Sequence, residues 1–257
     1  MSFVIHERRD SVAIVQLNRP EKFNSLTREM ILALSDLFKE FTQADLRAVI
    51  LTGTGDRAFC AGTDISELNE LNETEALQVS QRGQALCDLI EKCQVPVIAA
   101  INGLAVGGGC ELALACHIRI ASTNARFSLP ETKLGIIPGY GGTQRLPREI
   151  GQARALEAML AGRDLSAAEA LKLGLVNRVT ESAGLMKEAE QLAHDIAKLA
   201  PLAIRACLQA VTRGVELPLE AGLALEAELF ASLFATDDVR EGTNAFLEKR
   251  TPVFKGK

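Results

Sequence analysis

The sequence predicts an α/β protein in which short buried strands alternate with amphipathic helices. Residues 48–51 and 95–101 are apolar runs with the length and composition of buried strands. Apolar side chains recur at helical spacing over 27–41 and 73–93. Strands that alternate with helices in this way favour parallel pairing through helical crossovers.

The N-terminal segment begins with two candidate strands. Apolar residues over 12–17 fall near a period of two, and residues 3–5 can pair with them as a neighbouring strand. Thr27 is the expected N-cap of the first helix and places Glu29 in its first turn. The buried strand 48–51 follows this helix.

A second cycle has the same order. Its helix extends to about residue 93, the strand 95–101 ends at Asn102-Gly103, and another helix follows the glycine triplet 107–109. Further short strands are expected at 117–121 and 126–128. No sequence period of 20–50 residues is present, so a solenoid is not supported.

The residues after Gly151 are rich in Ala, Leu and Glu and predict a helical region. Ser166 and Glu169 have the spacing of a capping box at a helix start. The following helices are divided near Pro201, Gly214 and Thr236. We therefore expect a core domain over 1–195 and a C-terminal helical subdomain over 196–257, which packs on its own domain or on a partner subunit.

Composition places the 257-residue chain among soluble globular proteins. Apolar residues make up 47% and charged residues 24%, which excludes disordered, collagen-like and disulfide-scaffold classes. The net charge of −5 gives no support to nucleic-acid binding. The six cysteines form no C-x-x-C pair and are interpreted as buried thiols rather than a metal site. With no leader pattern and no unbroken apolar span, we expect a cytoplasmic protein that does not contact a membrane.

Two loops place backbone N–H groups where a ligand can reach them. The glycines of segment 102–111 open a helix whose positive end suits an anion or a developing oxyanion, although tight packing of the helix on a strand would also explain them. Small residues in segment 59–65 let a ligand approach the backbone; a plain loop with Asp64 as N-cap is the alternative. The glycine spacing does not fit a dinucleotide fingerprint.

Two carboxyl groups are candidates for acid and base chemistry. Glu111 lies among apolar residues of the helix after the glycines, so it is either buried or faces a cleft. Glu131 follows Ser128-Leu129-Pro130. Paired carboxyl groups in a dry pocket can divide acid and base roles, whereas a solvent-exposed Glu111 and a helix-terminal Glu131 would be inert.

A fourth feature is segment 134–146, whose Pro and Gly residues predict a close-packed turn before a helix. It could supply another backbone N–H to a site, and its Tyr140 either lines a pocket or fills a gap. His6, His117 and His194 lack metal-ligand spacing, and neither a G-x-S-x-G elbow nor a phosphate-binding P-loop occurs.

Taken in this order, the four features resemble the enoyl-CoA hydratase/isomerase family, the crotonase superfamily, over nearly the whole chain. The resemblance implies a crotonase-like spiral of ββα turns with a C-terminal helical trimerisation region, assembled as a homotrimer or homohexamer. It implies an acyl-CoA thioester substrate, no metal, and no cofactor apart from the coenzyme A of the substrate.

Site roles also follow from the resemblance. The backbone N–H groups of Thr63 and Gly108 would hold the thioester oxygen, and Thr63 stands where many members have alanine. Glu111 would act mainly as base and Glu131 would protonate the α-carbon, while the Gly139 N–H would help to place the water. Hydratases have both glutamates, so the resemblance implies enoyl-CoA hydration, as in fatty acid β-oxidation.

Contacts to coenzyme A are implied for six further positions, of which Lys249 would act from a neighbouring subunit: Lys22, Phe23, Ala61, Asp64, Ile65 and Lys249. Surface charge alone would also explain the two lysines. Alternatives to hydration of a straight enoyl-CoA are isomerisation, hydration of a branched or aromatic-pathway acyl-CoA, and RNA binding by a non-enzymatic member; a nicotinamide enzyme fits least.

Overall fold

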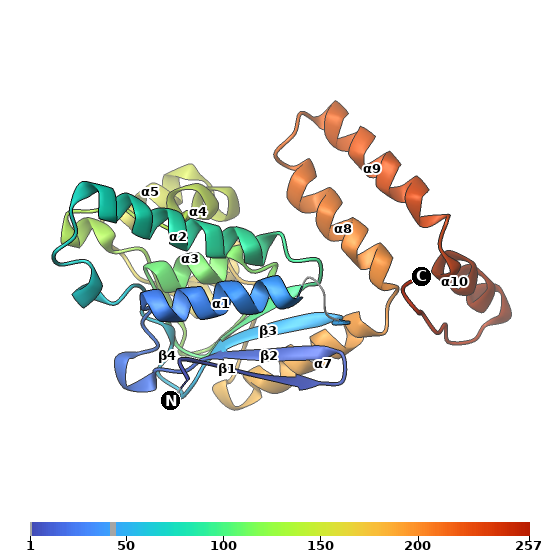
Figure 1. Ribbon diagram of the computed structural model, residues 1–257, viewed down its shortest axis with the longest axis horizontal. Coiled ribbons are helices and arrows are strands. Elements are labelled where there is room, and N and C mark those ends of the chain that lie inside the picture. The colour runs from blue at the N-terminus through green and yellow to red at the C-terminus, as the bar shows by residue number, and fades with distance from the viewer. Residues whose placement is uncertain (1, 42–44) are drawn as a thin grey trace.

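The computed structural model describes residues 2–41 and 45–257, in which two sheets are surrounded by helices (Figure 1). The larger sheet has the order β1-β2-β3-β5-β7-β10 and contains β1 (Val4–Arg9), β2 (Val12–Leu17), β3 (Ala48–Gly53), β5 (Val97–Ile101), β7 (Ile118–Ser122) and β10 (Arg178–Thr180). The smaller sheet has the order β4-β6-β8-β9 and contains β4 (Ala58–Cys60), β6 (Leu104–Val106), β8 (Arg126–Ser128) and β9 (Leu165–Ser166).

The chain builds both sheets through a repeating ββα turn. β3 enters the larger sheet, β4 enters the smaller one, and α2 (Glu73–Glu91) leads back to the larger sheet. β5, β6 and α3 (Gly108–Ala115) repeat this path, and β7 and β8 begin it again. Because β3, β5 and β7 pair in parallel, as do β4, β6 and β8, equivalent loops lie side by side. The parallel architecture predicted from the alternation is confirmed.

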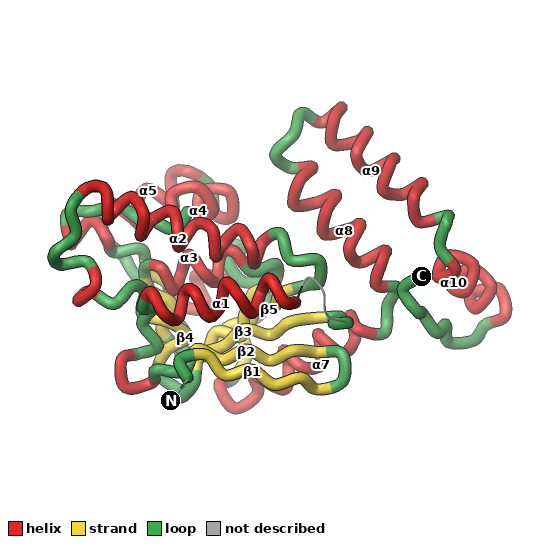
Figure 2. The backbone as a smooth tube through the Cα atoms, viewed as in Figure 1, coloured by secondary structure: helices red, strands yellow, loops and turns green. Residues whose placement is uncertain are grey.

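The remaining helices cover the sheets and form the C-terminal region. They are α1 (Arg28–Phe41), α4 (Gly142–Ile150), α5 (Gln152–Leu160), α6 (Ala167–Leu173), α7 (Leu185–Ala197), α8 (Pro201–Gly214), α9 (Leu219–Leu233) and α10 (Asp237–Glu248). Leu185, Ala189 and Ala193 of α7 pack against the face of the larger sheet opposite to α1 and α2 (Figure 2). The helices are therefore on both faces of that sheet, as parallel pairing requires.

The structure refines several local predictions. The helix after the glycine triplet begins at Gly108, so two of its glycines are helical. Asp64 caps a short 3₁₀ turn over Ile65–Glu67 rather than a longer helix. The predicted capping box is present, with Ser166 Oγ accepting the Glu169 N–H. The prediction of buried cysteines is wrong for Cys207, which is exposed because it lies on α8; the other five are buried.

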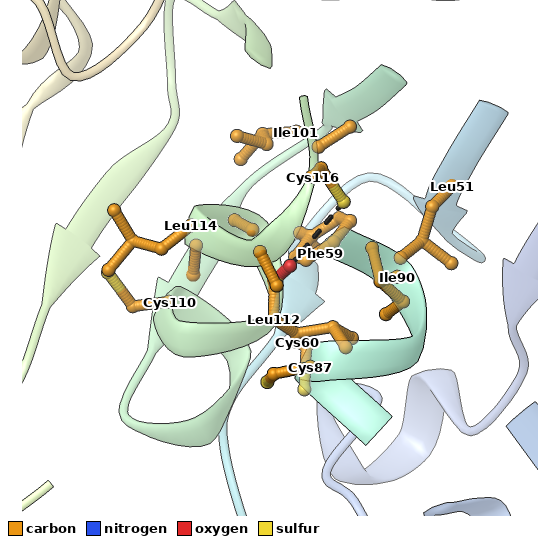
Figure 3. Close-up of a cluster of buried hydrophobic side chains, with 14 of the residues drawn as sticks. Leu51, Phe59, Cys60, Cys87, Ile90, Ile101, Cys110, Leu112, Leu114 and Cys116 are labelled. Carbon is orange, nitrogen blue, oxygen red and sulfur yellow. Dashed lines mark hydrogen bonds between the residues drawn. The ribbon is translucent and has the colours of Figure 1, made fainter. Parts of the chain in front are cut away.

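Helix α3 is fixed against β4 by close packing of small and apolar residues. A Cβ on Gly109 would lie 2.1 Å from the Cys60 carbonyl oxygen, so only glycine allows this approach. Figure 3 shows Phe59 and Cys60 of β4 surrounded by side chains of α2 and α3, where Cys116 Sγ donates a hydrogen bond to the Leu112 carbonyl at 3.4 Å. The packing of Gly109 on Cys60 fixes the N-terminus of α3 relative to the loop after β4.

The C-terminal helices extend away from the sheets as an arm of α8, α9 and α10 (Figures 1 and 2). Not one of the residues described in α8 and α9 is buried, although both helices carry large apolar side chains. The domain boundary predicted at 195/196 falls within α7, which packs on the core; the division remains a prediction. No helix in the described ranges is long and apolar enough to cross a membrane.

Truncation of Phe59 tests the importance of the β4–α3 contact. We expect Phe59→Ala to lower the free energy of unfolding by about 3–5 kcal/mol, because a buried aromatic side chain leaves a cavity when removed. Leu77→Ala, at a half-exposed position on α2, is the control and should change stability by less than about 0.5 kcal/mol. Urea denaturation measures both; equal small effects would show that the contact is unimportant.

Candidate active site

A cavity of about 850 Å³ opens where the loops after β4 and β6 meet the segment after β8. Helix α2 forms its opposite wall through Ala76, Val79, Ser80 and Gln84. The cavity brings together seven of the residues predicted from sequence: Ala61, Thr63, Ile65, Gly108, Glu111, Glu131 and Gly139. Parallel strand pairing explains this convergence, because the loops after β4, β6 and β8 leave the same edge of the sheet.

Two residues from adjacent loops, Thr63 and Gly108, line this cavity and carry backbone N–H groups. A Cβ on Gly62 would lie 3.2 Å from Gly108 N, and Gly62 has a φ of +90°, which favours glycine. The loop after β4 therefore lies directly against the start of α3. Within residues 2–41 and 45–257, no protein atom accepts a hydrogen bond from Thr63 N or Gly108 N. Both donors are available to a ligand, and Gly108 adds the positive end of a helix.

Glu111 is buried in the floor of the cavity. Its Oε1 accepts hydrogen bonds from Tyr140 N and Gly142 N, each at 2.7 Å. The pKa of Glu111 is raised to about 7, mainly by burial and in part by the nearby Glu131 carboxylate, while the two N–H donors and Arg145 act in the opposite direction. The group can therefore gain or lose a proton near neutral pH, which suits acid and base catalysis.

Glu131 faces the same cavity from the 3₁₀ turn η3 (Glu131–Leu134). Its Oε1 would lie 2.9 Å from a Cβ on Gly107, so glycine is needed there for the carboxyl group to fit. Its Oε2 is buried and has no hydrogen-bond partner among the described residues. Burial also raises the pKa of Glu131. A buried oxygen without a partner is costly, and it points to a ligand or water that binds there.

The turn that holds Glu111 is itself fixed from two sides. Ser80 Oγ and Gln84 Nε2 donate to the Gly139 carbonyl at 2.6 and 3.1 Å. Arg145 Nη1 donates to the Tyr140 carbonyl at 3.2 Å. The same guanidinium forms ion pairs with Glu91 at 2.7 Å and with Asp88 at 3.1 Å.

Sequence analysis missed the supporting residues of this turn. Ser80 and Gln84 carry no local signal, because their role depends on where α2 packs. Arg145 lies in the segment 134–146, whose turn was predicted without assigning any residue to hold it. The role predicted for the Gly139 N–H stays a prediction, while the Gly139 carbonyl serves to fix the turn.

The residues predicted to contact coenzyme A are divided between two regions. Phe23 lies beside the loop after β4, where its carbonyl accepts the Ala61 N–H at 3.0 Å and its ring lies under the Arg57 guanidinium. Lys22 ends the preceding 3₁₀ turn, Pro20–Lys22. Lys249 does not line the cavity; it follows α10 in the C-terminal arm.

Asp64 is held by its neighbours rather than free. Its Oδ2 accepts from Arg19 Nη1 at 2.6 Å, and its Oδ1 accepts from Ser66 N and Oγ. The Ser66 hydrogen bonds and Arg19 lower the pKa of Asp64 to about 2. These contacts tie the loop after β4 to the first turn of the chain, and the predicted contact of Asp64 with coenzyme A stays a prediction.

Within the described residues, no group of three His, Cys, Asp or Glu side chains is arranged to hold a metal ion. His117 has a structural environment, because its Nδ1 accepts the Val97 N–H at 2.9 Å and its Nε2 lies 3.1 Å from the Glu91 carbonyl. Among the groups that line the cavity are two carboxyl groups and two backbone donors.

Comparison with known proteins identifies similar chains. The sequence profile of the enoyl-CoA hydratase/isomerase family matches residues 7–257. A short-chain-enoyl-CoA hydratase of Clostridium acetobutylicum is 43% identical over 248 residues, which cover 96% of this chain and 95% of that protein. An (E)-benzylidenesuccinyl-CoA hydratase of Thauera aromatica is 44% identical over 251 residues, which cover 97% of this chain and 98% of that protein.

A crystal structure of an enoyl-CoA hydratase from Bacillus anthracis superimposes on the whole chain with a TM-score of 0.97 and 41% identity, covering 100% of both chains. Likeness over the full length includes the C-terminal arm as well as the two sheets. The predicted crotonase-like fold is confirmed.

The raised pKa of Glu111 makes stability depend on pH. Between its ordinary value of 4.5 and about 7, the folded protein binds more protons than the unfolded chain, so this group's contribution to the unfolding free energy falls as pH rises. Glu111→Gln removes the titrating group, and with it the fall in unfolding free energy that this group causes as pH rises. We expect the unfolding free energy of the variant, relative to the parent, to increase from pH 5 to pH 8 in urea denaturation; a difference independent of pH would contradict it.

Proposed function

This chain belongs to the enoyl-CoA hydratase/isomerase family, and we propose that it catalyses the reversible syn addition of water to a trans-2-enoyl-CoA, giving a 3-hydroxyacyl-CoA. The observation that carries the proposal is the arrangement of Glu111 and Glu131 around one cavity, beside the two backbone donors of Thr63 and Gly108. Each component of this arrangement corresponds to one requirement of the reaction.

The backbone donors supply the first requirement, which is stabilisation of negative charge. When water adds to C3 of the enoyl thioester, charge develops on the thioester oxygen. N–H groups of Thr63 and Gly108 can both donate to that oxygen, and they are already oriented because Gly62 and α3 fix them. Donors that need no reorientation stabilise the transition state more than the ground state.

The carboxyl groups supply the second requirement, which is transfer of two protons. The ionised Glu111 takes a proton from water as the water oxygen bonds to C3, and the protonated Glu131 gives its proton to C2. Two N–H donors on Oε1 favour the charged form of Glu111, whereas Oε2 of Glu131 has none. Since the two groups repel each other when both are charged, they titrate as a pair.

The remaining contacts of the substrate follow from the positions around the cavity. Ala61, Asp64 and Ile65 of the loop after β4 would contact the adenine and pantetheine of coenzyme A, and two of them, Ala61 and Ile65, line the cavity. Lys22 and Phe23 would contact it from the first turn, where the Phe23 carbonyl accepts the Ala61 N–H. The reaction needs no separate cofactor, because coenzyme A is part of the substrate. We place it in the cytoplasm, in fatty acid β-oxidation or a related pathway.

The C-terminal arm supports the assembly of several copies of this chain. Phe230 and Phe234 lie 5.1 Å apart between ring centroids, and both are more than half exposed, as is Phe246. Apolar patches of this kind on a soluble protein mark contact surfaces. We propose that the arm packs against other copies in a homotrimer or homohexamer, which would also bring Lys249 to a neighbour's coenzyme A.

Substitution of the two glutamates tests the reaction. We expect Glu111→Gln and Glu131→Gln each to lower kcat for crotonyl-CoA by about 10²–10⁴-fold, because each removes one proton transfer. Loss of the enoyl-thioester absorbance measures hydration. Butyryl-CoA should still bind both variants, and Glu157→Gln, at an exposed position on α5, should keep its kcat. No absorbance change by the parent protein with chains from C4 to C12 would reject the proposal.

Charged substitutions in the arm test the assembly. Phe230→Asp with Phe246→Asp should shift the protein from trimers or hexamers to monomers, because a buried unpaired charge prevents packing. Sedimentation velocity measures the change. Leu32→Asp, on α1, is the control and should leave the assembly intact. A parent protein that sediments as a monomer at micromolar concentration would contradict the proposed assembly.

A further inference from the structure

We propose that the ring of Tyr140 is a wedge, fastened by Thr63, that restricts the acyl group to short, unbranched chains. The inference rests on the proposed hydratase function, and it assigns a specificity role to two side chains. It depends on the location of the ring, on what holds it there, and on how close it lies to the reacting carbons.

The ring of Tyr140 fills the space between α2 and α3. A Cβ on Gly83 of α2 would lie 2.1–2.3 Å from three ring carbons, and a Cβ on Gly108 of α3 would lie 3.0 Å from the ring. Glycine is unfavourable inside a helix such as α2, where it costs backbone entropy. The ring explains why glycine is present at position 83, because any larger residue there would collide with the ring.

The hydroxyl group of Tyr140 is held by the side chain of Thr63. Thr63 Oγ1 lies 2.9 Å from the Tyr140 hydroxyl and forms a hydrogen bond with it. Burial raises the pKa of Tyr140 to about 12, so the phenol stays neutral at physiological pH. The backbone of the same residue is fixed by Glu111 and Arg145. The wedge is therefore attached at both ends and cannot swing out of the cavity without breaking these bonds.

The ring also lies beside the atoms that react. Thr63 and Gly108 supply the donors for the thioester oxygen, and the ring contacts Gly108 while its hydroxyl contacts Thr63. The peptide N–H of Tyr140 orients Glu111, which acts at C3. In this proposal, the carbons beyond C3 extend toward the ring. Because the ring occupies the space between α2 and α3, a long or branched chain cannot enter there, whereas a four-carbon chain needs no such space.

Removal of the ring tests the wedge. We expect Tyr140→Ala to raise the ratio of kcat/KM for trans-2-octenoyl-CoA to that for crotonyl-CoA by at least about tenfold, the effect of one or two methylenes in an apolar pocket. Tyr140→Phe keeps the ring and should leave this ratio close to that of the parent. Thr63→Ala keeps the backbone donor but releases the ring, so its ratio should lie between the two.

Binding of saturated thioesters separates this proposal from the proposed reaction. Butyryl-CoA and octanoyl-CoA cannot be hydrated, and their dissociation constants, measured by calorimetry, should show the same change of ratio in Tyr140→Ala. An unchanged ratio in that variant, or an equal change in Tyr140→Phe, would overturn the wedge even if crotonyl-CoA is hydrated. If crotonyl-CoA is not hydrated, the ratio of the dissociation constants of octanoyl-CoA and butyryl-CoA still tests whether the ring limits chain length. If Tyr140→Ala does not fold, Tyr140→Leu replaces it and should show the same change in the ratio of dissociation constants.

Discussion

The pair of hydrogen bonds that Tyr140 N and Gly142 N donate to one oxygen of Glu111 is the interaction on which the site depends. A carboxyl group this deeply buried needs such partners, because an unpaired charge in an apolar environment is strongly disfavoured. The requirement extends to the turn that supplies the donors. A Cβ on Gly142 would lie 3.0 Å from Glu111 Oε1, and Gly141 has a φ of +109°, so both positions favour glycine. Arg145 then holds the turn in place against α2.

The spiral path of the chain makes this arrangement possible. Each ββα turn delivers one strand to the smaller sheet, and the parallel order β4, β6, β8 stacks the three following loops at one edge. Gly107 is joined to the next turn by the hydrogen bond from its N–H to the Ser128 carbonyl at 2.8 Å, three residues before Glu131. The proposed donors, base and acid thus come from three successive turns, and the distances between them are set by strand spacing rather than by the loops alone.

The sequence predicted the main elements because their signals are local. Apolar runs such as 95–101 and the capping box at Ser166 depend only on neighbouring residues, and both were found in the structure. The glycine triplet was ambiguous between packing and oxyanion binding. The structure shows packing at Gly109, which lies on Cys60, and a Gly108 N–H without an acceptor among the described residues, so oxyanion binding stays a prediction. Arg145 and Ser80 could not be assigned, since they act across 54 and 59 residues and depend on the packing of α2.

Burial of the two carboxyl groups shows how stability is exchanged for chemistry in this fold. Burial raises the pKa of both Glu111 and Glu131, so ionisation of either group weakens the folded state as pH rises above the ordinary carboxyl value; for Glu111 this loss extends to about pH 7. The hydrogen bonds to Glu111 offset part of this loss, whereas Oε2 of Glu131 is left without a partner. A reacting carbon or water can then approach the oxygen without first displacing a protein donor. This unequal compensation places two chemically identical side chains in different environments, which is what the proposed division of acid and base roles requires.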